Sequence, residues 1–185
     1  MSKRSPAKFA AFFRNLNLGR THCPDRPMFE SAFLAAGADS AQSFLTNGTM
    51  VFVASSTGQA RKVLTAASEY LAAACGLKEP AYLRDVEDLR EMVRRDPFSA
   101  VDRAGVYDCY ISFLHPQARL PSDAPWQSAR RDVTAVHVEP GEVFSVVHKV
   151  SNSPGSPNAW LEKMLGLPAT TRAWNTIVRL VQKHT

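Results

Sequence analysis

The densest group of reactive side chains lies near the end of the chain, in the ten residues Pro168–Ile177. Pro168 ends the preceding segment, and Thr170 or Thr171 is expected to cap a helix that follows. The first amide groups of that helix, the positive end of its dipole and Arg172 would together attract an anion. The alternative is structural, because a helix start needs capping groups whether or not a ligand binds there.

A second polar motif occupies residues 14–19, Arg-Asn-Leu-Asn-Leu-Gly, where a predicted strand ends. Its Arg-x-x-Asn spacing recurs in the closing stretch, and two such motifs could clamp an anion between charged forks and amide donors. The sequence predicts that this site comprises Arg14, Asn17, Gly19, Thr171, Arg172 and Asn175. The same motifs could instead join two halves of the protein. Both hypotheses require the motifs to approach within roughly 12 Å, the reach of two long side chains with a ligand or water between them.

The charge of the chain is concentrated at its beginning. Residues 1–26 carry a net charge of +5, whereas the remaining residues are neutral overall. A short basic segment predicts weak binding of nucleic acid at most. The early apolar run Phe9–Phe13 is too short to span a membrane, and no signal peptide is recognised. We therefore expect a cytoplasmic protein that has no membrane segment.

The cysteines and histidines do not form a recognisable metal or redox motif. Cys23, Cys75 and Cys109 are odd in number and widely spaced, which is typical of reduced thiols. If Pro140-Gly141 form the turn of a hairpin, His137 faces Phe144 and His148 faces Val133, which separates the two imidazoles by about 13 Å. The sequence thus predicts no metal site and no cofactor.

The first half of the chain has the pattern of a ferredoxin-like subdomain. Apolar periodicity and turn signals predict strand, helix, hairpin, helix and strand in that order, which is the βαββαβ plan. The hairpin is centred on Asn47-Gly48, and a capping box begins at Ser56. A charged helix capped by Asp85 follows. We assign residues 1–98 to this subdomain and its trailing helix.

The second half repeats part of that order. A strand is expected at residues 107–113, a short helix near Trp126, and a hairpin around Pro140-Gly141. A helix beginning at Ser156 or Asn158 and the closing helix complete it. Residues 99–185 are therefore predicted to form a second α+β subdomain, a related βαββα unit with an extra C-terminal helix.

Four motifs carry a resemblance to a known family. They are Arg14–Gly19, the hairpin Phe44–Phe52, Asp96-Pro97-Phe98, and Pro168–Thr176, which is similar to the pattern P-A-T-T-R-N-W-N-T. In this order the chain resembles the bacterial family called domain of unknown function 1697, from about residue 8 to residue 181. The resemblance implies a two-subdomain α+β fold and no established activity. This chain departs from the family pattern at Asn15, Asn47, Thr49 and Ala173.

Three classes of function remain open. The first is a module that binds a small anionic or phosphate-bearing ligand between the two subdomains. The second is a structural or interaction protein in which the same motifs join the subdomains. The third is a small-molecule enzyme that works by positioning and cationic stabilisation. Nucleophile, phosphate-loop and zinc-protease signatures are absent from the sequence, so no reaction is implied.

Overall fold

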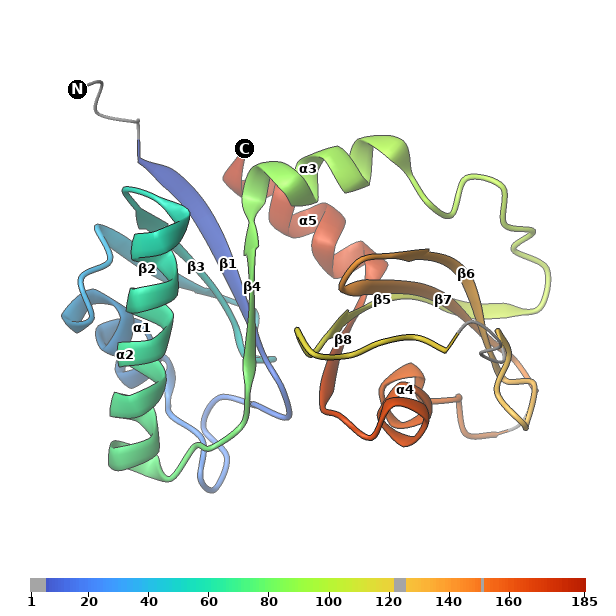
Figure 1. Cartoon of the computed structure of the whole chain (residues 1–185), viewed down its shortest axis with the longest axis horizontal. Coiled ribbons are helices and arrows are strands. Elements are labelled where there is room, and N and C mark those ends of the chain that lie inside the picture. Colours follow the sequence, from blue (N-terminus) through green and yellow to red (C-terminus); the bar gives the residue numbers. More distant parts are fainter. Residues whose placement is uncertain (1–5, 122–125, 151) are drawn as a thin grey trace. The chain divides into compact units, whose positions relative to one another are not determined.

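The protein is described by a computed structural model that covers residues 6–121, 126–150 and 152–185. Lys3 and Arg4 of the basic segment lie outside these ranges. The described residues form five helices and two four-stranded antiparallel sheets (Figure 1), which confirms the predicted α+β class. The chain divides into two compact units, Met1–Leu89 with His184–Thr185, and Arg90–Lys183.

The first unit has the ferredoxin-like arrangement. Its sheet has the strand order β2-β3-β1-β4, with every neighbouring pair antiparallel. Both α1 and α2 cover the same face of this sheet (Figure 1). The elements are β1 (Ala7–Phe13), α1 (Arg26–Ala35), β2 (Ser40–Phe44), β3 (Thr49–Ala54), α2 (Thr57–Cys75) and β4 (Ala81–Asp85).

Aromatic rings fill the core between the sheet and these two helices. Alternate residues of a strand face the same side, so Phe9 and Phe13 of β1 both point at the helices. The Phe33 ring lies 5.1 Å from the Phe52 ring and 5.8 Å from the Phe29 ring, measured between centroids. The predicted cap of α2 is also present, because Ser56 Oγ accepts a hydrogen bond from the Gln59 amide at 3.1 Å.

The second unit uses the same strand order. Its sheet runs β6-β7-β5-β8, which repeats β2-β3-β1-β4 position by position. The helix α4 covers one face of the sheet, packing Leu161 against Leu114, Val143 and Ala169. The elements are α3 (Val86–Arg95), which starts in the first unit, then β5 (Val106–Leu114), β6 (Val133–Glu139), β7 (Glu142–His148), α4 (Pro157–Leu165), β8 (Ala169–Ala173) and α5 (Trp174–His184).

The helix predicted near Trp126 is wrong for the residues that the structure describes. Between β5 and β6 the described segments are irregular, and Gln127 forms an isolated bridge with Thr134. Prolines at positions 116, 121 and 125 explain the difference. Each proline lacks an amide donor and disfavours a helical conformation in the residue before it.

The predicted helix start at Thr170 or Thr171 is also wrong. Both threonines belong to β8, in which Thr170 pairs with Phe113 and Arg172 pairs with Ile111 of β5. The chain then enters α5 at Trp174 without a loop. Strand pairing satisfies the backbone groups, and β-branched threonines suit a pleated surface better than a helix.

The β6–β7 hairpin confirms one predicted pairing and contradicts another. His137 lies opposite Phe144, as expected. However, Val133 lies opposite the residue before His148, because Val136 is an extra residue that shifts the register of β6. Such a β-bulge bends its strand and re-aims the neighbouring side chains.

Candidate ligand-binding sites in the two units

Arg14 is fixed at the end of β1 by an ion pair within the first unit. Its Nη1 lies 2.7 Å from Glu79 Oε2, and both side chains are partly exposed. The amide of Asn15 approaches the other oxygen of that carboxylate at 3.4 Å. The Arg14 backbone amide also donates to the Pro80 carbonyl at 2.9 Å. The segment before β4 therefore holds the start of the polar loop.

The rest of this loop is fastened to the β2–β3 turn. Phe13 donates its amide to the Gly48 carbonyl at 2.8 Å, and Leu18 donates to the Thr46 carbonyl at 2.9 Å. A Cβ added to Gly48 would lie 2.7 Å from Leu16 Cβ, so only glycine allows this close approach. The loop is thus backed by a closely packed turn.

Asn17 and Gly19 both lie on the exposed side of the loop. The Asn17 carbonyl accepts from the Arg20 amide at 3.3 Å, and the Gly19 amide donates to the Pro24 carbonyl at 2.9 Å. Gly19 has φ +79°, a left-handed conformation that glycine adopts without strain. These two residues shape the turn of the loop.

A cavity of about 430 Å³ lies beside this loop in the first unit. Its polar lining comes from Asn15, Thr21, His22, Lys78 and Glu79, and Cys23 also borders it. Asn15 and His22 adopt positive φ angles of 50° and 57°. Strained backbone of this kind is concentrated at functional sites. Because Arg14 neutralises Glu79, Lys78 gives the cavity a positive balance.

The second-unit residues of the predicted site do not share one surface. Thr171 faces α4, where its hydroxyl lies 2.7 Å from Ser112 Oγ and 3.2 Å from Asn158 Oδ1. Arg172 follows Thr171 in β8 and points to the opposite face of the sheet. Asn175 is exposed in the first turn of α5. The strand at this position, which the sequence did not predict, separates the three side chains.

Arg172 is buried, with only 7% of its surface exposed. Its Nη1 donates to Thr170 Oγ1 at 2.8 Å and to the Thr171 carbonyl at 2.9 Å. Burial lowers the pKa of Arg172 to about 10, so the guanidinium stays protonated at neutral pH. The buried charge therefore bonds one hydroxyl and one carbonyl of its own strand.

The second unit also holds a charged cluster that the sequence reasoning missed. Arg95 forms a bidentate ion pair with Glu139, with N–O distances of 2.9 and 3.3 Å. His137 Nε2 lies 3.1 Å from the same carboxylate. Burial raises the pKa of Glu139, but hydrogen bonds from Arg95 and His137 outweigh that effect, and the pKa lies below its ordinary value.

A sequence signal for this cluster did exist. His137 and Glu139 are two residues apart in a strand, so both face the same side. The Asp96-Pro97-Phe98 motif ends the helix that carries Arg95. The approach between α3 and β6 is a long-range contact that no local pattern predicts, and a glutamate beside a turn is ordinarily solvated. Glu139 is only 21% exposed.

In the ranges that the structure describes, no group of three or more histidine, cysteine, aspartate or glutamate side chains is arranged to hold a metal ion. None of the helices described there is both long enough and apolar enough to cross a membrane. Cys23, Cys75 and Cys109 are free thiols.

Comparison with known proteins identifies a family and a similar fold. Residues 7–144 match the profile of the family described as "Protein of unknown function (DUF1697)". No match was found among curated proteins. A solved structure, that of the conserved bacterial protein SP0830 from Streptococcus pneumoniae, is similar with a TM-score of 0.64. The two chains are 14% identical over 98% of this chain and 100% of the other, a likeness that shows the fold alone.

Proposed function

The chain belongs to the DUF1697 family of proteins of unknown function, and we propose that it binds a small anionic ligand in the first unit. The binding site is the cavity beside the loop that follows β1. The observation that carries this proposal is the lining itself. Lys78 supplies a cation, Thr21 and Asn15 supply a hydroxyl and an amide, and Arg14 cancels the charge of Glu79.

Each of these groups has a separate part in binding. The Lys78 ammonium is a compact charge that suits a phosphate or carboxylate oxygen. Asn15 and Thr21 donate hydrogen bonds that orient the ligand. Glu79 lines the cavity and is paired with Arg14, so its negative charge is compensated when an anion binds. The volume of about 430 Å³ is suited to a small molecule and not to a polymer.

A second candidate function, a purely structural role for the arginine motifs, is favoured by Arg172. Its guanidinium is buried and bonded to residues of its own strand. Removing Arg172 would then change stability and leave ligand affinity intact. Removing Lys78 would do the reverse. The two substitutions therefore separate the two functions.

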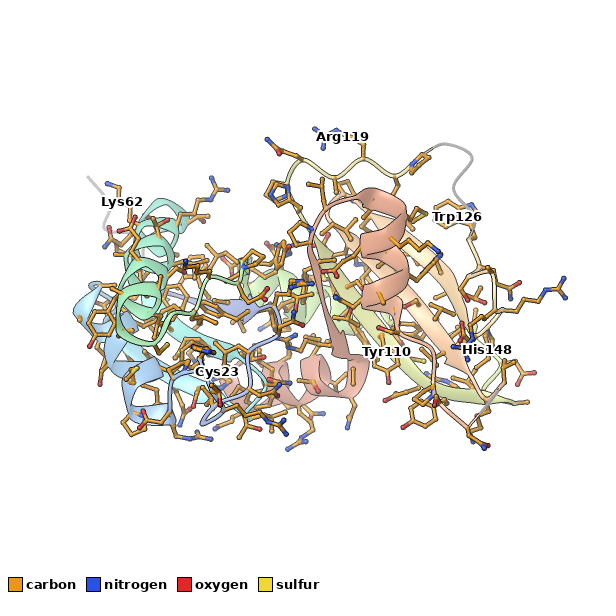
Figure 2. All side chains as sticks on the ribbon, turned by 90° about the horizontal axis from the view of Figure 1, so that it is seen from below. Cys23, Lys62, Tyr110, Arg119, Trp126 and His148 are labelled. Carbon is orange, nitrogen blue, oxygen red and sulfur yellow. The ribbon has the colours of Figure 1, made fainter. Side chains whose placement is uncertain are left out.

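The test is a titration of the full chain with inorganic phosphate, followed by NMR chemical shifts of the backbone amides. We expect shifts centred on the Asn15 and Thr21 amides. Lys78→Met should weaken phosphate binding about tenfold, the loss of one charge-assisted contact. Lys62→Met is the matched control, since Lys62 is exposed on α2 and lies apart from Cys23 of the cavity (Figure 2).

Two results would contradict the proposal. One is the absence of any phosphate-dependent shift in the loop after β1 at about 10 mM phosphate, roughly ten times a dissociation constant of 1 mM. The other is an equal loss of affinity in the Lys62 and Lys78 variants. That pattern would mean that phosphate only screens the general positive charge of the chain.

A further inference from the structure

The second unit contains a cavity of about 310 Å³ that is separate from the anion site. It lies where α3 ends, next to the β6–β7 hairpin. The residues that give it chemical character are Arg95, Asp96, Pro97, His137, Glu139 and Phe144. Its volume is at the low end of the range for ligand pockets, so its occupant must be small.

We propose that this cavity binds a small zwitterion of the α-amino acid type. Arg95 binds the carboxylate of the ligand, and Glu139 and Asp96 bind its ammonium group. Two carboxylates against one guanidinium give the cavity a negative balance. The two carboxylates therefore disfavour a simple anion, and a simple cation binds the carboxylates but makes no contact with Arg95. A ligand that carries both charges satisfies all three residues.

A ligand carboxylate can replace Glu139 in the ion pair with Arg95 inside the cavity. Arg95 is 56% exposed, and its fork is occupied by both oxygens of Glu139. Because the guanidinium is largely exposed, water weakens this pair, and a ligand carboxylate can take the place of Glu139. His137 remains within 3.1 Å of Glu139 and holds that carboxylate at the cavity, ready for the ammonium group.

The backbone around the cavity carries two irregularities that aim its polar groups. Asp96 has φ +42°, which is uncommon for a residue other than glycine. One of its oxygens accepts from the Phe98 amide at 3.2 Å. Across the cavity, the bulge at Val136 places His137 opposite Phe144, with ring centroids 5.7 Å apart. Strain and bulges are both concentrated at functional sites.

An apolar wall completes the cavity and predicts an aliphatic side chain on the ligand. Phe144 packs against Phe98 and Trp174, with ring centroids 6.1 and 5.9 Å apart. These contacts fix the wall before a ligand arrives. Met92 and Pro97 line the cavity beside it. The ligand class is therefore an amino acid with a short apolar side chain.

The first test compares three probes on the unaltered full chain by NMR titration. L-leucine carries both charges, 3-methylbutylamine carries only the ammonium group, and 4-methylpentanoate carries only the carboxylate. We expect leucine to shift the amide resonances of Asp96, His137 and Glu139. Each single-charge probe should bind at least about tenfold more weakly, the effect of losing one charged contact.

The second test uses neighbouring arginines of α3. Arg95→Gln should weaken leucine binding about tenfold or more. Arg94→Gln is the matched control, because Arg94 is 74% exposed and pairs with Glu91 on its own helix. It removes the same charge and should leave the affinity unchanged. Arg95→Lys, which keeps the charge and loses the fork, should give an intermediate affinity.

Three outcomes would overturn the proposal. The first is that leucine shifts no resonance of the cavity at about 10 mM. The second is that either single-charge probe binds as tightly as leucine, which would identify a site for a simple anion or a simple amine. The third is that Arg94→Gln and Arg95→Gln weaken binding equally.

Discussion

The two units share a strand order and differ in what fills the space beside the sheet. In the first unit, α1 and α2 cover one face, and phenylalanine rings pack between helices and strands. In the second, α4 covers the corresponding face, and the described segment in the place of α1 is irregular. That face carries the hydroxyls of Ser112, Ser145 and Thr171. One topology therefore supports two kinds of interior.

The face of the second sheet that carries these hydroxyls, called the hydroxyl face below, needs hydrogen-bond partners that the aromatic core of the first unit does not need. Ser112 and Thr171 satisfy one another at 2.7 Å across paired strands. Ser145 is fully buried, and its hydroxyl has no partner within the part of the chain that the structure describes. A buried polar group costs free energy unless it is hydrogen-bonded, so small changes here alter stability more than their volume suggests.

The edge strands of the two units carry an arginine at the same place. Arg84 is the fourth residue of β4, and Arg172 is the fourth residue of β8. Each donates from Nη1 to the carbonyl of the preceding residue, at 2.7 Å for Arg84 and 2.9 Å for Arg172. They differ in burial, since Arg84 is partly exposed.

The largest effect should come from the aromatic interior of the first unit. Phe33→Ala removes a fully buried ring that contacts Phe13, Phe29 and Phe52. We expect unfolding to become easier by about 3–5 kcal/mol, measured by denaturant titration with circular dichroism. Leu34→Ala, at an exposed neighbour, should change it by about 0.5 kcal/mol or less. Equal losses would mean that the rings do not carry the core.

The next effect tests the two edge arginines. Arg172→Met should cost about 1–3 kcal/mol, because its buried hydroxyl and carbonyl partners lose their donor. Arg84→Met should cost less, because water can replace a partly exposed guanidinium. All three tryptophans, Trp126, Trp160 and Trp174, lie in the second unit, so their fluorescence follows the unfolding of the unit that holds Arg172, and circular dichroism follows the Arg84 variant. A greater loss for Arg84 would reverse the comparison.

A smaller effect is expected at the hydroxyl face. Thr171→Val keeps the shape of the side chain and removes its bonds to Ser112 and Asn158. Unfolding should become easier by about 1 kcal/mol. A double-mutant cycle with Ser112→Ala measures the coupling between the two hydroxyls. If the two single losses simply add, the hydroxyls do not act as a pair.

The smallest effect is a dependence of stability on pH through Glu139. The pKa of Glu139 lies below its ordinary value in the folded chain, so its ionised form stabilises the fold. This contribution is complete above the ordinary value of 4.5 and is lost as the pH falls through the lower, folded-state pKa. Glu139→Gln should cost about 0.5–1 kcal/mol at pH 7 and nothing below both values. A loss that is unchanged at low pH would exclude the ion pair as its cause.

The sequence predicts the first unit far better than the second. Strand alternation in β1, the capping serine of α2 and the Asp85 cap of α3 are local signals, and the structure confirms each of them. The strand at Thr170 and Thr171 was missed because pairing with β5 is a long-range contact that local propensity does not contain. The helix predicted near Trp126 fails for a different reason, because the prolines of this segment disfavour a helix in the described residues between β5 and β6.

The candidate sites show the same limit. The local pattern predicted that Arg14, Asn17 and Gly19 lie in one loop, and the structure has them there. For residues 168–177 the pattern predicted one helix that would group these side chains. Residues 169–173 instead form the strand β8, which places Thr171 and Arg172 on opposite faces. The approach of Arg95 to Glu139 spans 44 positions in the chain and has no local signature.

The bonds that tie the loop after β1 to Thr46 and Gly48 have a kinetic consequence for the anion binding that we propose. A loop that is already ordered loses little conformational entropy when it is occupied. Binding should therefore be a single concentration-dependent step, without the slow phase of a segment that folds around its ligand. The residence time would then be set by the few contacts that the anion makes.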